Sequence, residues 1–283
     1  MLSGLITGVI VRIDTNSLSV TPVAKIGEQC EEQYEESKCG RVLGMTFTKT
    51  GKLLVCDAVF GLFMIDLDKR VEENRISESK YDHHVEYTAL LTPDTLVNGS
   101  HNIVFNSLVL ASDDKTVYVT VSSTNFPLQD ALWEVSTEPS GRVLKFDLET
   151  KQTDVLVSGI SFANGIELDP NEEFLIFCES GRAKLHKYYL KGDKAGSSEV
   201  FVDSLPGLPD NIKLNDNGHY YVGLISPRLP GKPHIMEIVG PHNMVRRFLV
   251  RLVCLVMIPI RMISNILPNP FTNKFDYWVG KLT

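Results

Sequence analysis

The sequence predicts an all-β fold of the β-propeller type, a ring of four-stranded blades, because one hairpin motif recurs along the chain. The clearest copy runs from Phe162 to Cys178, and further copies begin at Phe105 and Pro209, with a fainter one at Leu43. Each copy is an apolar strand, a turn rich in Asp, Asn and Gly, and a second apolar strand, which is typical of a β-hairpin. A β-sandwich would also contain many short strands, but it would not repeat one motif at every fourth strand.

Third and fourth strands complete three of these units. Third strands are expected at 61–66, 141–147 and 184–189, and fourth strands at 87–91, 154–157 and 199–202. At the N-terminal end, segments 8–14 and 20–25 match a third and a fourth strand alone, and no third strand is recognisable after the hairpin that begins at Pro209. We therefore expect a ring that is incomplete at both ends, with unpaired edges.

Composition limits the function classes. A chain of 283 residues that is 43% hydrophobic can bury a large core. The net charge of −7 and the pI near 5.5 argue against a nucleic-acid partner, which normally meets a basic face. We expect one propeller domain over residues 1–283.

Residues 227–283 are expected to form an irregular C-terminal insertion within that domain. Its apolar stretch between Arg251 and Arg261 is too short to span a bilayer, and it is predicted to be a helix that ends near Pro259. Such a helix, with a basic edge and an apolar face, either packs over the propeller as a lid or lies on an anionic membrane surface.

Cys30 and Cys39 flank a Glu-rich loop. A short loop between two cysteines suits a disulfide in an oxidising compartment, whereas five reduced cytosolic cysteines are the alternative. The other cysteines, Cys56, Cys178 and Cys254, lie in apolar runs and are expected to be buried thiols.

Asn98 begins an N-glycosylation sequon, Asn-Gly-Ser, in a polar loop. The sequon and the cysteine pair together favour a secreted or lumenal protein. No signal peptide is visible after Met1, which conflicts with that interpretation unless a further N-terminal segment exists.

Several runs resemble the strictosidine synthase-like family, in particular its animal branch. The match extends from about Gly8 to about Ser226 and weakly on to Thr283. The runs that carry it are residues 39–44, 55–63, 162–166, 190–202 and 205–212, of which Pro-Gly-Leu-Pro-Asp-Asn at 206–211 is the most specific.

This resemblance implies a six-bladed propeller on the lumenal or extracellular side of a membrane, at the endoplasmic reticulum or the cell surface, behind an N-terminal anchor that this chain lacks. It also supports a Cys30–Cys39 disulfide. Ser107 and Val121 stand where the family usually has Asp. The family's last blade, which carries the catalytic glutamate of strictosidine synthase, has no counterpart before Thr283.

The start of each blade's first strand is the candidate site, because first strands line the central channel of a propeller. These positions hold Asn106, Asn164 and Asp210 with Asn211, whose side-chain oxygens are ligands that Ca²⁺ prefers. Resemblance to paraoxonase-type and gluconolactonase-type propellers implies a divalent metal there, with low affinity because only one of these ligands is a certain carboxylate. The alternative is that these residues cap strand starts and turns.

The leading functional interpretation is a hydrolase with arylesterase-type activity on small esters at the channel, assisted by Ca²⁺ if it is active. A non-catalytic, membrane-associated binding or adhesion propeller is the alternative, and a strictosidine-synthase-type lyase ranks third. The sequence has no Gly-rich phosphate loop and no Gly-x-Ser-x-Gly elbow, and its seven histidines are scattered. It therefore identifies no catalytic residue.

Overall fold

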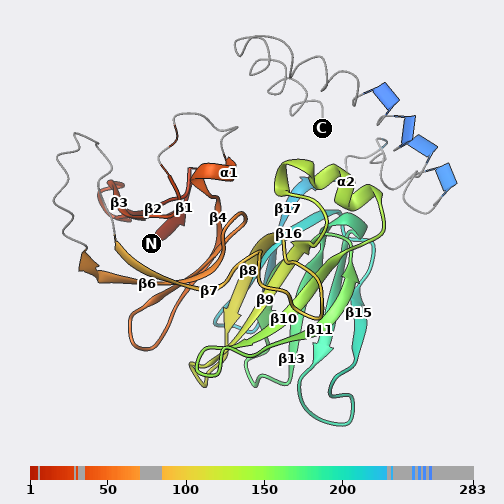
Figure 1. Cartoon of the computed structure of the whole chain (residues 1–283). Helices are drawn as coiled ribbons and strands as arrows, with labels where there is room; N and C mark the ends of the chain where they lie inside the picture. The colour runs from red at the N-terminus through yellow and green to blue at the C-terminus, as the bar shows by residue number, and fades with distance from the viewer. Residues whose placement is uncertain are drawn as a thin grey trace.

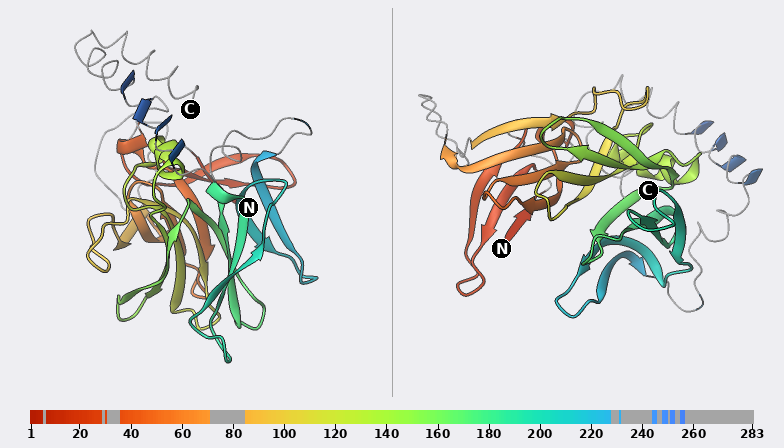
Figure 2. Two further views of the ribbon diagram at one scale, coloured as in Figure 1. Left: turned by 90° about the vertical axis from the view of Figure 1, so that its right-hand side faces the viewer. Right: turned by 90° about the horizontal axis from the view of Figure 1, so that it is seen from below.

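The computed structural model describes residues 1–5, 7–28, 30, 36–70, 85–227 and 231, together with short helical pieces at 244–245, 248–249, 251–252 and 255–256 (Figure 1). Antiparallel sheets follow one another in chain order around an arc (Figure 2). The described chain is a β-propeller, as the repeated hairpins predict.

Three complete blades have four strands each, in sequential order from the inside outwards. Blade 1 consists of β4 (Val42–Phe47), β5 (Leu53–Asp57), β6 (Gly61–Arg70) and β7 (Val85–Leu91). Blade 2 consists of β8 (Val104–Leu110), β9 (Thr116–Ser123), β10 (Gly141–Asp147) and β11 (Thr153–Ile160). Blade 3 consists of β12 (Ala163–Leu168), β13 (Phe174–Glu179), β14 (Lys184–Tyr189) and β15 (Ser198–Val202).

The first sheet has three strands, whereas the sequence predicts two. These are β1 (Leu2–Gly4), β2 (Val9–Ile13) and β3 (Val20–Lys25). The additional strand pairs Leu2 with Arg12 and Gly4 with Ile10. It is short and contains Ser3 and Gly4, so no apolar pattern marks it in the sequence. A two-stranded sheet, β16 (Gly207–Leu214) and β17 (Tyr220–Pro227), hereafter the last hairpin, lies at the other end of the arc.

The hydrophobic core lies between neighbouring blades. The inner strands β4, β8, β12 and β16 contact one another in this order around the arc. Buried side chains such as Leu54 in blade 1 and Phe105 in blade 2 form one shared cluster, and Val143 in blade 2 and Phe177 in blade 3 form the next. Each blade therefore buries both faces of its sheet only because it has two neighbours.

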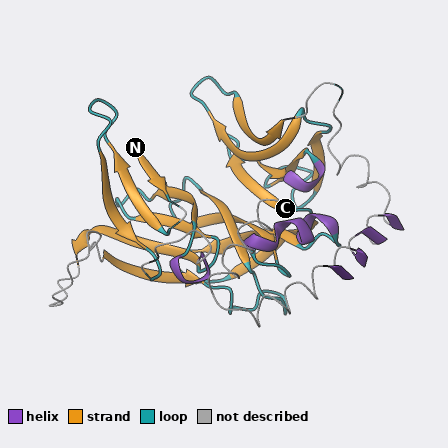
Figure 3. Cartoon of the chain, turned by 90° about the horizontal axis from the view of Figure 1, so that it is seen from above, coloured by secondary structure: helices purple, strands orange, loops and turns teal. Residues whose placement is uncertain are grey.

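In the part of the chain up to Pro227 that the structure describes, the helices are short and lie outside the sheets (Figure 3). The helices there are α1 (Glu36–Cys39), η2 (Leu128–Asp130), α2 (Ala131–Ser136) and η3 (Ser180–Arg182). The insertion that contains η2 and α2 was not predicted. It is tied to β9 by the buried Glu134, whose carboxylate accepts hydrogen bonds from the Ser123 hydroxyl at 2.7 Å and from the backbone N–H of Ser140 at 2.8 Å.

The predicted C-terminal insertion, 227–283, falls almost wholly outside the described residues, and so do Cys254 and Pro259. Within it the structure describes only the short helical pieces between 244 and 256. Among the described residues, no helix has both the length and the apolar character needed to cross a membrane.

Candidate functional site

The inner strands of blades 2 and 3 and of the last hairpin share one irregularity. The pairing with the second strand breaks after Phe105 in β8, after Ala163 in β12 and after Pro209 in β16. The residues inside these bulges are Asn106–Ser107, Asn164–Gly165 and Asp210–Asn211. Bulges re-aim side chains and are common beside active sites. The predicted site residues therefore occupy one structural position on neighbouring strands.

Glycine allows the β12 bulge to lie against the β16 bulge. A Cβ atom on Gly165 would lie 2.6 Å from the carbonyl oxygen of Asp210 and 2.7 Å from the Cα atom of Asn211. Gly44 of β4 has the same relation to β8, since its Cβ would lie 2.9 Å from the Cα atom of Ser107. Only a residue without a side chain permits this approach.

Serine hydroxyls orient the two asparagines. The Asn106 Nδ2 group donates to the Ser122 hydroxyl at 2.9 Å, and that hydroxyl donates to the Ala163 carbonyl of blade 3 at 2.7 Å. Asn164 and Ser180 repeat the arrangement at 3.2 Å, with Ser180 donating to a carbonyl of β16. Each serine thus links its blade to the next and turns the amide nitrogen toward its own blade, which leaves the amide oxygen as the available group.

The amide oxygen of Asn164 is buried and has no hydrogen-bond partner. A buried hydrogen-bond acceptor without a partner costs free energy. This amide oxygen is therefore suited to bind a cation or a hydrogen-bond donor. Asp210, half-buried, supplies a carboxylate on the adjacent strand. Two amide oxygens and one carboxylate fit a hard cation such as Ca²⁺ in kind. The described residues contain no cluster of three or more His, Cys, Asp or Glu that could hold a metal, so a site here would depend on the amides.

A buried carboxylate next to this site was missed by the sequence analysis. Glu179 ends β13, directly before Ser180, and its carboxylate lies 2.7 Å from His186 Nε2 and accepts the backbone N–H of Ser161 at 2.9 Å. Burial alone would raise the pKa of Glu179, but the contact with His186, the Ser161 N–H and the charge of Arg182 together hold it below its ordinary value. A glutamate at the end of a hairpin's second strand, with a histidine on the next strand, was the signal available in the sequence.

The four cysteines among the described residues are as predicted. The disulfide between Cys30 and Cys39 is present, with their Cα atoms 5.7 Å apart. Cys56 and Cys178 are free and buried. Burial, with a contribution from the charge of Asp210, raises the pKa of Cys178 to about 12, so this thiol stays protonated at neutral pH and is no nucleophile.

Asn98 is exposed and adopts a left-handed backbone conformation, with φ of 50°, in the turn from Val97 to Ser100. The sequon is therefore accessible, and its glycosylation stays a prediction.

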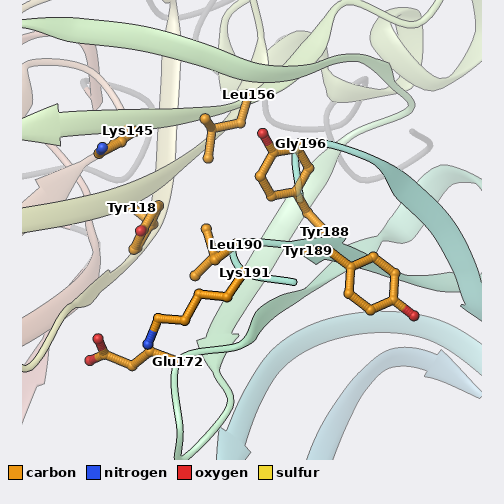
Figure 4. Close-up of a pocket in the computed structure, with 9 residues that line it drawn as sticks. All are labelled: Tyr118, Lys145, Leu156, Glu172, Tyr188, Tyr189, Leu190, Lys191 and Gly196. Carbon is orange, nitrogen blue, oxygen red and sulfur yellow. The ribbon is translucent and has the colours of Figure 1, made fainter. Parts of the chain in front are cut away.

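A separate cavity of about 270 Å³ lies between blades 2 and 3 (Figure 4). Tyr118, at its wall, is near the start of β9, whereas Ser122 is near the end of that strand. The cavity therefore lies at the opposite end of the strands from the bulges and is not the predicted site. Its lining residues are Tyr118, Lys145, Leu156, Glu172, Tyr188, Tyr189, Leu190, Lys191 and Gly196.

Comparison with known proteins gives sequence relatives over nearly the whole chain. A family model described as strictosidine synthase matches residues 106–193. The adipocyte plasma membrane-associated protein Hemomucin of Drosophila melanogaster is 36% identical over 281 residues, which cover 99% of this chain and 46% of that protein. The adipocyte plasma membrane-associated protein of Gallus gallus is 30% identical over 89% of this chain and 57% of its own length. The chain thus spans about half the length of the curated relatives that it matches.

Solved structures support the fold. A gluconolactonase from Xanthomonas campestris superposes with a TM-score of 0.55 at 12% identity, over 79% of this chain and 65% of the other. The calcium-binding protein regucalcin from Agrobacterium tumefaciens superposes with a TM-score of 0.50 at 14% identity, over 77% and 60%. At these identities the likeness shows a shared propeller architecture and nothing about activity.

Proposed function

Because the chain belongs to the strictosidine synthase-like family, we propose that it is a hydrolase of small esters, of the arylesterase type, that acts at the inner-strand bulges with a divalent cation such as Ca²⁺. The observation that carries this proposal is the repeated bulge, which places Asn106, Asn164 and Asp210 on adjacent strands and leaves the Asn164 amide oxygen buried without a partner. Two propellers of the same architecture are named as a gluconolactonase and as a calcium-binding protein, so the fold accommodates ester chemistry and calcium.

The residues have distinct roles in this proposal. Asn106, Asn164 and Asp210 would hold the divalent cation, which would supply Lewis acidity toward an ester carbonyl and an attacking water. Asn106 and Asn164 contribute neutral oxygens, and Asp210 contributes the charge. Ser122 and Ser180 fix the amides, so the oxygens are pre-oriented before any ligand binds.

The test is hydrolysis of phenyl acetate by the purified protein with and without EGTA. Asp210→Ala is expected to lower kcat/KM by at least about 100-fold and Asn106→Ala by about 10-fold, because the first removes charge as well as an oxygen. Asp216→Ala, an exposed carboxylate in the turn of the same hairpin, is the matched control and should leave activity unchanged. Ester hydrolysis that neither EGTA nor Asp210→Ala alters would overturn the proposal.

Calcium binding is measured separately through the thermal midpoint of unfolding. Added Ca²⁺ should raise the midpoint of the wild type and not that of Asp210→Ala, since a ligand that binds only the folded state stabilises it. This measurement does not depend on the choice of ester.

A non-catalytic, membrane-associated binding propeller is the second candidate. Ser107 in the β8 bulge and Val121 on the paired strand β9 stand where the family usually has Asp, so Asp210 is the one carboxylate in the three bulges. The relatives are named as plasma membrane-associated. Stabilisation by Ca²⁺ without hydrolysis of any of a panel of aryl esters and lactones would favour it. The lyase ranks last.

The disulfide and the exposed sequon support a position on the lumenal or extracellular side of a membrane, reached through an N-terminal anchor. Sensitivity of the cell-expressed protein to endoglycosidase, lost in Asn98→Gln, tests this location.

A further inference from the structure

Arg142, the second residue of β10, is a buried residue whose guanidinium makes one hydrogen bond within the described part of the chain. The residue is 7% exposed, and its Nη1 group donates to the Val97 carbonyl at 3.1 Å. Its Nε group is buried and has no partner. A guanidinium offers five N–H donors, and a buried donor without a partner costs free energy.

Arg142 forms no ion pair with any described residue. Leu144 and Phe146 lie on the same face of β10 as Arg142. Both belong to the apolar cluster that blade 2 shares with Leu54 and Leu62 of blade 1. Burial lowers the pKa of Arg142, and no carboxylate among the described residues opposes this effect. The cation therefore lies at the edge of an apolar interface without an acidic neighbour in that part of the chain.

The internal repeat shows where a countercharge belongs. Arg142 lies directly opposite Val121, the β9 residue that is paired next to the β8 bulge. In blade 3 the same position of β13 holds Glu179, whose carboxylate lies 2.7 Å from His186 Nε2 and 3.5 Å from Arg182 Nη1. Blade 3 thus has a carboxylate beside basic groups at this position, whereas blade 2 has a valine opposite Arg142.

A second buried polar group, Asn102, lies shortly after Val97, whose carbonyl accepts the hydrogen bond from Arg142. Asn102 is 0% exposed, and neither its amide oxygen nor its amide nitrogen has a partner. It follows the turn whose Val97 carbonyl accepts from Arg142, and the next residue, Ile103, is hydrogen-bonded to the end of β9. Arg142 and Asn102 thus both carry buried polar atoms without a partner among the described residues, and such atoms are ordinarily paired with protein, water or an ion.

We propose that Arg142 and Asn102 bind a small monovalent anion, either chloride or the carboxylate group of an organic acid, at the interface of blades 1 and 2. The anion accepts from Arg142 Nε and Asn102 Nδ2 and takes the place that Glu179 fills in blade 3. A water beside the anion donates to the Asn102 oxygen, which an anion cannot satisfy. This site is independent of the esterase proposal, because it shares no residue with the bulges.

The experiment measures the thermal midpoint of the whole chain at a constant ionic strength of about 0.15 M, with methanesulfonate replaced stepwise by chloride or by formate. A saturating anion should raise the wild-type midpoint by about 3 °C or more. A rise with chloride alone identifies a halide site, and a rise with formate and with larger carboxylates identifies an organic acid. Bromide soaked into crystals should appear beside Arg142.

Two variants make the test specific. Arg142→Met removes the cation and should abolish the anion dependence, whereas Arg12→Met, at an exposed position of β2, should retain it. Val121→Asp installs the acid that the repeat lacks, so it should raise the midpoint in methanesulfonate and make it insensitive to chloride. The proposal is overturned if neither anion changes the wild-type midpoint, or if the anion dependence persists in Arg142→Met. The comparison with Arg142→Met remains valid even if Val121→Asp does not fold.

Discussion

Asp57 and Glu179 hold the same place in two blades, the last residue of the second strand, yet their surroundings shift their pKa values in opposite directions. Both are buried. Burial raises the pKa of Asp57 by more than the backbone N–H groups of Phe60 and Val59 and the charge of Lys25 lower it. At Glu179 burial also raises the pKa, but the contact with His186, the Ser161 N–H and the charge of Arg182 together lower it by more. One position in the repeat therefore gives two different electrostatic roles.

Glu179 should stabilise the fold above the ordinary pKa of a glutamate, about 4.3. Its folded-state pKa is lowered, so this stabilisation is present above that value and is lost as the pH falls through the folded pKa, because the unfolded chain takes up the proton first. Glu179→Gln should cost about 1–2 kcal/mol at pH 7 and progressively less in acid. Urea unfolding from pH 7 to pH 3 measures the difference.

The exposed carboxylate of Glu149 provides the control for this prediction. Glu149→Gln should change the free energy of unfolding by no more than about 0.5 kcal/mol across the range. An equal cost of Glu179→Gln at pH 7 and pH 3 would show that its role is packing alone.

Among the structural elements, the inner strands depend on glycine at the points where two of them approach closely. Gly165 of β12 lies so close to β16 that a methyl group would overlap the backbone of Asp210 and Asn211. Gly165→Ala should therefore cost about 2 kcal/mol or more and separate the two bulges, so that calcium stabilisation falls as well. Chemical unfolding measures the first effect.

Gly223 of β17 is the matched glycine, because a Cβ atom there would lie 3.7 Å from its nearest neighbour, an ordinary contact. Gly223→Ala should be neutral or stabilising by up to about 1 kcal/mol, since alanine loses less backbone freedom in a strand. Equal destabilisation by both substitutions would mean that the close approach of β12 and β16 is not what Gly165 provides.

The elements that the sequence predicts well are those with strong local signals. The hairpins beginning near Phe105 and Phe162 were predicted because apolar strands flank Asp-rich and Asn-rich turns. By contrast, β1 consists of three residues without a pattern, and α2 is an insertion held by the buried Glu134, whose partners Ser123 and Ser140 are apart in sequence. Contacts of this kind are set by the tertiary fold.

In the candidate site, too, the sequence predicts the residues that carry a local signal and misses the contacts that the tertiary fold creates. Repetition located Asn106, Asn164 and Asp210, since each copy of the motif marks its own position. The serine links, the contact between Glu179 and His186, and the unpaired Arg142 depend on which side chains meet between strands and blades. Those encounters have no fixed spacing along the chain, so the sequence alone does not predict them.

At the scale of the whole molecule, the arc of sheets leaves the last hairpin with apolar side chains in solvent. Strand β17 pairs only with β16 among the described strands, and Ile225 on it is 56% exposed, with Tyr221 exposed as well. A strand with a free edge and apolar side chains is a template for pairing with another chain. We therefore expect this chain, expressed alone, to self-associate at micromolar concentration.

Ile225→Lys should reduce that self-association, because a charge on an edge strand opposes pairing with a second copy. Leu96→Lys is the matched control: Leu96 is 58% exposed, but it lies in a loop outside the strands, so association should persist. Light scattering after size-exclusion chromatography measures both. A monodisperse wild-type monomer would show that the edge of β17 is covered in solution. Equal association of the two lysine variants would show that the apolar side chains of β17 do not cause the self-association.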